Sequence, residues 1–169
     1  MFRLTPLVRN LVIINVVVFL AQNLLSNLHL TEYLSLWSIH SPNFKPYQFF
    51  TYMFAHGGFG HIFFNMFALA SFAPILEGYW GEKKFLIFYL ATGIGAGVIY
   101  AAANFFLGTG AGGIMLGASG AIYGILMAFG MVFPNLELML LFPPIPIKAK
   151  YMVFIMGFIT YALDRSGTV

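Results

Sequence analysis

From Phe85 to Leu136 the chain reads FLIFYLATGIGAGVIYAAANFFLGTGAGGIMLGASGAIYGILMAFGMVFPNL, without a single charged residue. A helix needs about 20 apolar residues to cross a bilayer, so this run is too long for one span and suits two. Four glycines between residues 108 and 113 mark the turn between them. We therefore predict spans at about 85–107 and 114–133, within an all-α polytopic membrane bundle.

The remaining expected elements lie on either side of this run, where charged residues separate the apolar segments. Working outward, we predict further spans at about 7–25, 59–76 and 149–163, and an aromatic-rich loop over 26–58 that lies in the membrane interface. Five spans in this chain, with neither a repeat nor a polar second segment, predict one membrane domain over residues 1–169.

The composition excludes several other classes of protein. The chain is 60% hydrophobic and only 8% charged, whereas soluble domains are nearer a quarter charged. A water-soluble fold and a disordered chain are both excluded on this ground. The absence of cysteine excludes disulfides, thiolate metal sites and cysteine nucleophiles. The net charge of +3 comes from scattered residues, so we expect no nucleic-acid partner.

The placement of the basic residues predicts the orientation. With a cytoplasmic N-terminus, six basic residues lie inside (Arg3, Arg9, Lys83, Lys84, Lys148 and Lys150) and two outside (Lys45 and Arg165). This distribution follows the positive-inside rule, and the opposite orientation violates it. A cleaved signal peptide is the alternative for the first segment, but no convincing small-x-small cleavage site precedes His29.

Polar residues inside the predicted spans are the candidates for chemistry. His61 and Asn65 lie four residues apart, on one face of the second span near its outer end. Ser119 lies in the first two turns of the fourth span, at similar depth. Gly117 and Gly120 flank it and leave its hydroxyl uncovered. A serine nucleophile needs such exposure, a base and donors for the oxyanion.

Each of these residues has a purely structural alternative. Small residues around Ser119 also suit close helix packing, and a serine in a span often bonds its own backbone. His61 is equally compatible with a bridge between helices or a cap on the second span. His56, His61 and Asn65 together suggest a metal site only weakly, because no carboxylate or cysteine accompanies them.

Three segments resemble the rhomboid family of intramembrane serine proteases. They are HGGFGHIFFN from His56 to Asn65, EGYWG from Glu77 to Gly81, and GASGAIYG from Gly117 to Gly124. The resemblance extends over the spans from about residue 7 to 165. It implies a six-helix core and hydrolysis of peptide bonds in membrane-embedded substrates, without a cofactor or metal.

The resemblance also implies roles for individual residues. Ser119 resembles the nucleophile, and His61 and Asn65 resemble the side-chain oxyanion donors, acting with the Ser119 backbone N–H. Tyr123 resembles the aromatic residue that packs against the catalytic histidine, and His56 resembles the residue that orders the outer end of the second helix. The implied substrates are single-span membrane proteins cut near the outer leaflet, and we expect a bacterial inner-membrane location.

The sequence departs from the family pattern in two places. Tyr47 and Gln48 stand where the family often has a Trp-Arg pair in the first loop, which puts that loop's hydrogen bonding in doubt. No histidine follows His61, although the family takes its general base from a sixth helix. We expect that the chain stops before that helix and is inactive alone.

Two other classes of function are alternatives to the enzyme. A non-catalytic relative that binds membrane proteins is the alternative, although the intact GASG motif favours the enzyme. A transporter or channel is disfavoured, because the predicted spans lack acidic or basic side chains at mid-depth.

Overall fold

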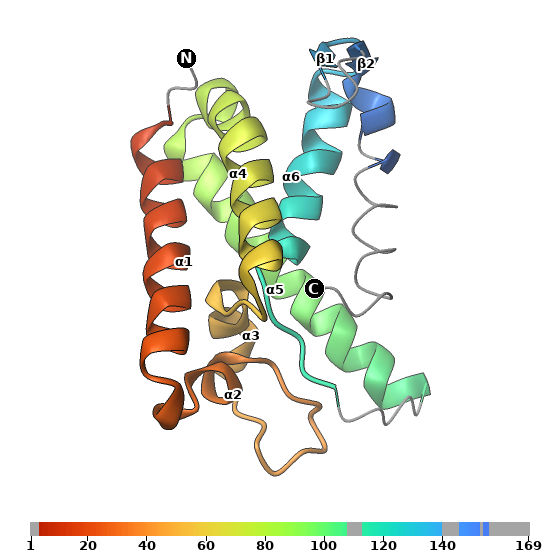
Figure 1. Ribbon diagram of the computed structural model, residues 1–169. Helices are drawn as coiled ribbons and strands as arrows, with labels where there is room; N and C mark the ends of the chain where they lie inside the picture. The colour runs from red at the N-terminus through yellow and green to blue at the C-terminus, as the bar shows by residue number, and fades with distance from the viewer. Residues whose placement is uncertain (1–3, 108–112, 140–145, 153, 156–169) are drawn as a thin grey trace.

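The computed structural model is a helical bundle, and it describes residues 4–107, 113–139, 146–152 and 154–155 (Figure 1). Its elements, in chain order, are α1 (Pro6–Leu24), η1 (Ser26–Leu28), α2 (Leu30–Leu34), α3 (Gln48–Thr51), η2 (Tyr52–Phe54), α4 (Phe59–Trp80), α5 (Glu82–Leu107), α6 (Ser119–Val132), β1 (Glu137–Met139) and β2 (Pro146–Lys148). The predicted all-α membrane bundle is confirmed.

Three of these helices are long and apolar enough to cross a membrane: α1, α4 and α5. They coincide with the first three predicted spans, although α4 continues to Trp80 and α5 begins at Glu82. Figure 1 shows that these helices connect two ends of the bundle. We call them the loop end, which carries α2 and α3, and the hairpin end, which carries β1 and β2.

The fourth helix is shorter than expected. α6 has 14 residues and begins at Ser119, whereas the apolar run predicted a start near Ile114. The preceding residues are extended, because Met115 exchanges two backbone hydrogen bonds with Leu36, at 2.8 and 2.9 Å. Gly117 then adopts a φ of 108°, which ends the extended segment. Hydropathy alone predicts neither the extended segment around Met115 nor the positive φ of Gly117.

The proline-rich connector contains a small hairpin, which the sequence reading did not foresee. β1 and β2 pair antiparallel, with Glu137 opposite Lys148 and Met139 opposite Pro146. Residues 149–152 are helical and begin the predicted span over 149–163. Most of that span, from residue 156 onward, lies outside the described residues.

The loop from 26 to 58 is folded rather than extended, and a glutamine organises part of it. The Gln48 side chain is buried, accepts the backbone N–H of Lys45 (3.1 Å) and of Trp37 (3.4 Å), and donates to the Asn43 carbonyl (3.1 Å). The doubt raised by the missing arginine is thus resolved for this part of the loop. The Gln48 amide has one acceptor oxygen and one donor NH₂ group, and together they bond three backbone groups of the loop.

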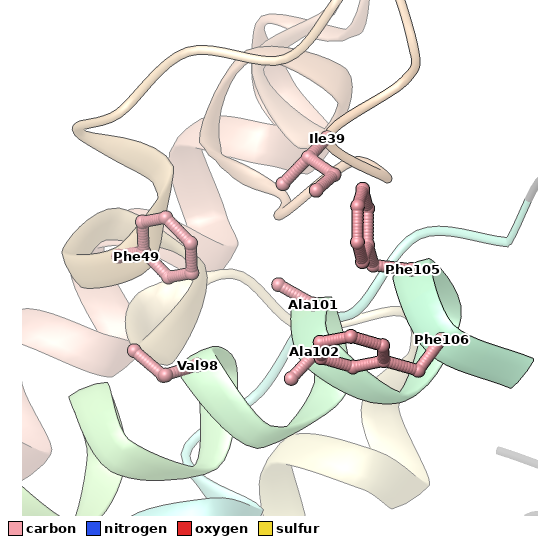
Figure 2. Close-up of a pocket in the computed structure, with 7 residues that line it drawn as sticks. All are labelled: Ile39, Phe49, Val98, Ala101, Ala102, Phe105 and Phe106. Carbon is pink, nitrogen blue, oxygen red and sulfur yellow. The ribbon is translucent and has the colours of Figure 1, made fainter.

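An apolar hollow of about 330 Å³ lies between this loop and the end of α5 (Figure 2). Ile39 and Phe49 line it from the loop, and Phe105 and Phe106 line it from α5. None of the predicted site residues borders it, so the hollow is separate from the site described below.

Glycines allow α5 and α6 to pack closely. A Cβ built on Gly120 would lie 2.6 Å from the Cβ of Ala96, and one on Gly124 would lie 2.7 Å from the Cβ of Thr92. Backbones approach this closely only where side chains are small. The packing alternative for these glycines is therefore correct, and it operates beside the candidate site.

Polar side chains join α1 to α4 at the hairpin end. The Thr5 hydroxyl, just before α1, donates a hydrogen bond to the buried carboxyl group of Glu77. Because each partner lies at the end of a long helix, this bond fixes the relative height of α1 and α4.

Candidate active site

The candidate site begins with the first turns of α4. His61 and Asn65 lie one turn apart on this helix; Asn65 is buried and His61 is half-buried. Gly58 caps the helix in an extended conformation and supplies no side chain to the first turn. The imidazole and the amide therefore share one face near the helix start, as the spacing predicts.

Gly117 brings the segment before α6 against both of these side chains. A Cβ built on Gly117 would lie 2.5 Å from Nε2 of His61 and 3.7 Å from Nδ2 of Asn65. A side chain at this position would have to displace the His61 ring, and the φ of 108° also favours glycine. The backbone N–H of Gly117 donates to the Tyr52 carbonyl at 2.9 Å, which holds the segment in place.

Ser119 follows two residues later and is the first residue of α6. It is half-buried, and the preceding Ala118 provides no side-chain cap. The N–H groups of a first helical turn lack partners within the helix and carry partial positive charge. The start of α6 therefore combines a serine hydroxyl with backbone donors that suit a developing negative charge.

Tyr123 and Gly120 complete the start of α6. Tyr123 lies one turn beyond Ser119 and is half-buried. Gly120 faces α5 and η2, since a Cβ built on it would lie nearest to the Ala96 Cβ of α5 and the Tyr52 hydroxyl of η2. The predicted role of Tyr123, packing against a catalytic histidine, stays a prediction.

His56 lies behind His61 and is almost fully buried, with 2% of its surface exposed. Its Nδ1 lies 3.3 Å from the Phe54 carbonyl, and its ring meets the His61 ring edge-on, with centroids 5.1 Å apart. Burial, reinforced by the neighbouring His61, lowers the pKa of His56 to about 4. The ring is therefore neutral at physiological pH.

Gln22 is a further residue near this site, and the sequence did not predict it. This residue of α1 is buried and hydrogen-bonds both backbone groups of His56. The available signal was a glutamine within an otherwise apolar segment, since intramembrane polar residues usually have a partner.

The weak metal interpretation finds no support in the part of the chain that the structure describes. No group of three or more His, Asp, Glu or Cys side chains gathers there. The neighbours of His61 are instead an amide, another imidazole and a glycine backbone, a set suited to hydrogen bonding.

Long apolar helices and a polar cluster at one end of the bundle define a helical membrane protein. A family model described as the rhomboid domain matches residues 43–167, and the chain belongs to the rhomboid family. The predicted family is thereby confirmed.

Two curated relatives share part of this sequence. The chain is 32% identical over 93 residues to "Rhomboid protein 1, mitochondrial" of Saccharomyces cerevisiae. The matched region covers 55% of this chain and 27% of the relative. The chain is 30% identical over 95 residues to "Putative rhomboid protease YdcA" of Bacillus subtilis. This second matched region covers 55% of this chain and 45% of the relative. The matched region thus spans less than half of either relative.

Proposed function

We propose that this domain, residues 1–169, is an intramembrane serine endopeptidase that cleaves single-span membrane proteins near the outer leaflet. The contact of Gly117 with His61 and Asn65 carries the proposal, because it joins the segment that leads into Ser119 to two side chains able to donate N–H groups. The rhomboid family and the printed name of the Bacillus relative support the same reaction class.

The proposed reaction is acyl transfer. The Ser119 hydroxyl attacks the substrate carbonyl, a base takes the hydroxyl proton and returns it to the leaving amine, and water then hydrolyses the ester. The oxyanion receives hydrogen bonds from His61, Asn65 and the Ser119 backbone. Loss of one such donor costs roughly 100- to 1000-fold in rate, so we expect Asn65→Ala to fall within or below that range.

The general base is the unassigned part of this mechanism. The family resemblance assigns it to a histidine on a sixth helix, and no histidine follows His61 in these 169 residues. His61 is unsuited to replace it, because the oxyanion would then lose a donor. We propose that the 169 residues are inactive alone and that a sixth helix with a histidine restores cleavage.

We further propose that the N-terminus is cytoplasmic and that the protein resides in a bacterial inner membrane. Figure 1 supports the orientation, since the N-terminus, the turn between α4 and α5, and the hairpin lie at the same end of the bundle. Arg9 lies near the start of α1, Lys83 and Lys84 lie in the first turn of α5, and Lys148 lies in β2. Their common side agrees with the positive-inside rule.

Cleavage of a reconstituted single-span substrate tests the proposed activity. The protein is the chain continued by an apolar helix that bears one histidine. We expect two fragments from this protein, and none from its Ser119→Ala variant or from the same helix with alanine in place of the histidine. Cleavage that persists in Ser119→Ala would refute the nucleophile assignment.

A non-catalytic protein that binds other membrane proteins is the alternative to the proposed enzyme. Such a protein would retain an uncut single-span client through detergent extraction. Equal retention by the Ser119→Ala variant, with no cleavage by any extended form, would favour binding over catalysis.

A further inference from the structure

Gln22 forms a two-point contact with the backbone of His56. Its Oε1 accepts the His56 N–H at 3.0 Å, and its Nε2 donates to the His56 carbonyl at 3.3 Å. The same Nε2 donates to Oγ1 of Thr31 at 2.8 Å. The side chain is 6% exposed, so water does not compete for these bonds.

This contact fixes a residue that its own chain holds only loosely. Two glycines, Gly57 and Gly58, separate His56 from the start of α4, and Gly58 supplies no side-chain cap. Glycine has more conformational freedom than other residues, so this linker does not by itself fix the His56 ring. A side-chain amide that holds both the N–H and the C=O of His56 restricts both of its backbone dihedrals.

The restriction extends to the proposed oxyanion site through one ring contact. The His56 ring meets the His61 ring at an interplanar angle of 71° and a centroid distance of 5.1 Å. The same His61 ring lies close to Gly117, because a Cβ built on Gly117 would be 2.5 Å from its Nε2. The His61 ring is thus a neighbour of both the His56 ring and Gly117.

We propose that Gln22 is a positioning residue, which holds the His56 backbone and thereby sets the direction of the His61 ring toward Gly117. The catalytic meaning of this role rests on the proposed function, but the positional role does not. In this proposal, Gln22 of α1 orders the segment that leads into α4 by binding the His56 backbone.

Gln48 provides a matched control. It is likewise a buried glutamine with three hydrogen bonds, but its partners are Trp37, Asn43 and Lys45 within the loop. Replacement by methionine removes the donors and the acceptor of either glutamine while nearly keeping its volume. Gln22→Met and Gln48→Met therefore lose the same number of bonds at different places.

The test measures the geometry of the site directly, in the 169-residue chain in lipid nanodiscs. The readout is the nuclear Overhauser cross-peak between the His61 ring protons and the Gly117 α-protons. We expect it in the wild type and in Gln48→Met, and we expect its loss in Gln22→Met. A cross-peak retained in Gln22→Met, or lost equally in Gln48→Met, would overturn the proposal.

A milder variant covers the case in which Gln22→Met does not fold. Thr31→Val removes only the third partner of Gln22, so the cross-peak should weaken without a change in the fold; an unchanged cross-peak in this variant would count against the proposal.

In the chain extended by a histidine-bearing helix, Gln22→Met should lower kcat up to about 100-fold, as expected of a small misplacement of catalytic groups. Cleavage that survives Ser119→Ala would overturn the proposed function while leaving the cross-peak result valid.

Discussion

At the loop end of the bundle, the segment before α6 meets α4 through the Gly117 backbone and the His61 ring, whereas at the hairpin end the two helices meet through aromatic rings. There the rings of Phe72 and Phe129 lie 5.1 Å apart, edge-on, and the ring of Tyr79 on α4 meets that of Phe133 just after α6. The loop end needs a particular backbone and a vacant Cβ position. The contact between α4 and α6 at the hairpin end needs only apolar volume, so the two contacts should respond differently to substitution.

The largest effect is expected at Gly117. In Gly117→Ala, the added Cβ would collide with the His61 ring, and the positive φ would be strained. Backbone strain costs about 1–3 kcal/mol and overpacking costs a similar amount. The unfolding midpoint in detergent should fall accordingly. Gly58→Ala, at an extended glycine with open space around it, should change little; equal loss in both variants would contradict the account.

Removal of an aromatic ring from the hairpin end should cost stability without disturbing the site. We expect Phe129→Ala to destabilise the bundle by roughly 3 kcal/mol, toward the lower end of the range for core Phe→Ala changes, because lipid rather than water is the alternative environment. The His61–Gly117 cross-peak should persist in this variant. Its loss would mean that the two ends are coupled.

Acid should weaken the loop end selectively through His56. Its pKa is about 4 in the fold and near 6.5 when unfolded, so the unfolded chain binds the proton more tightly. Stability is therefore full above pH 6.5 and falls by roughly 3 kcal/mol as the pH drops to 4.

The thermal unfolding midpoint between pH 7 and 4 checks this expectation. His56→Phe keeps a ring but cannot titrate at this position, and it leaves the facing His61 in place. The pH dependence of the variant should therefore be flatter than that of the wild type. Identical profiles would assign the acid sensitivity to another group.

The smallest effect is expected along the contact between α5 and α6. A Cβ on Gly124 would lie 2.7 Å from two carbons of Thr92, so Gly124→Ala should cost about 1–3 kcal/mol through overpacking. Gly95 has open space around it, and Gly95→Ala should be neutral or slightly stabilising, since alanine favours helices. The unfolding midpoints of the two variants test this expectation. A lower midpoint for Gly95→Ala than for Gly124→Ala would exclude tight packing at Gly124.

The long helices could be predicted from the sequence because hydropathy alone sets them. The charge-free run from Phe85 and the acidic stop at Glu77 located α4 and α5 to within a few residues. The start of α6 could not be predicted, because it depends on Leu36, nearly eighty residues away, which pairs with Met115.

The candidate site could likewise be predicted from the sequence only in part. His61, Asn65 and Ser119 could be selected because polar residues are costly inside a membrane span. That Gly117 would meet His61 follows only from its φ of 108° and the fold around it. The partner of Gln22 was equally hidden, since a glutamine in one helix does not identify the backbone group that it will bind.

The most direct test of the site is the accessibility of residue 119 to water on one side of the membrane. The chain has no cysteine, so Ser119→Cys carries a single thiol. We expect a membrane-impermeant maleimide to modify this thiol in intact cells, whereas the thiol of Lys83→Cys should react only after permeabilisation. A Ser119→Cys thiol that reacts only after permeabilisation, or that remains unmodified while the denatured protein reacts, would contradict a serine site open to the outer surface.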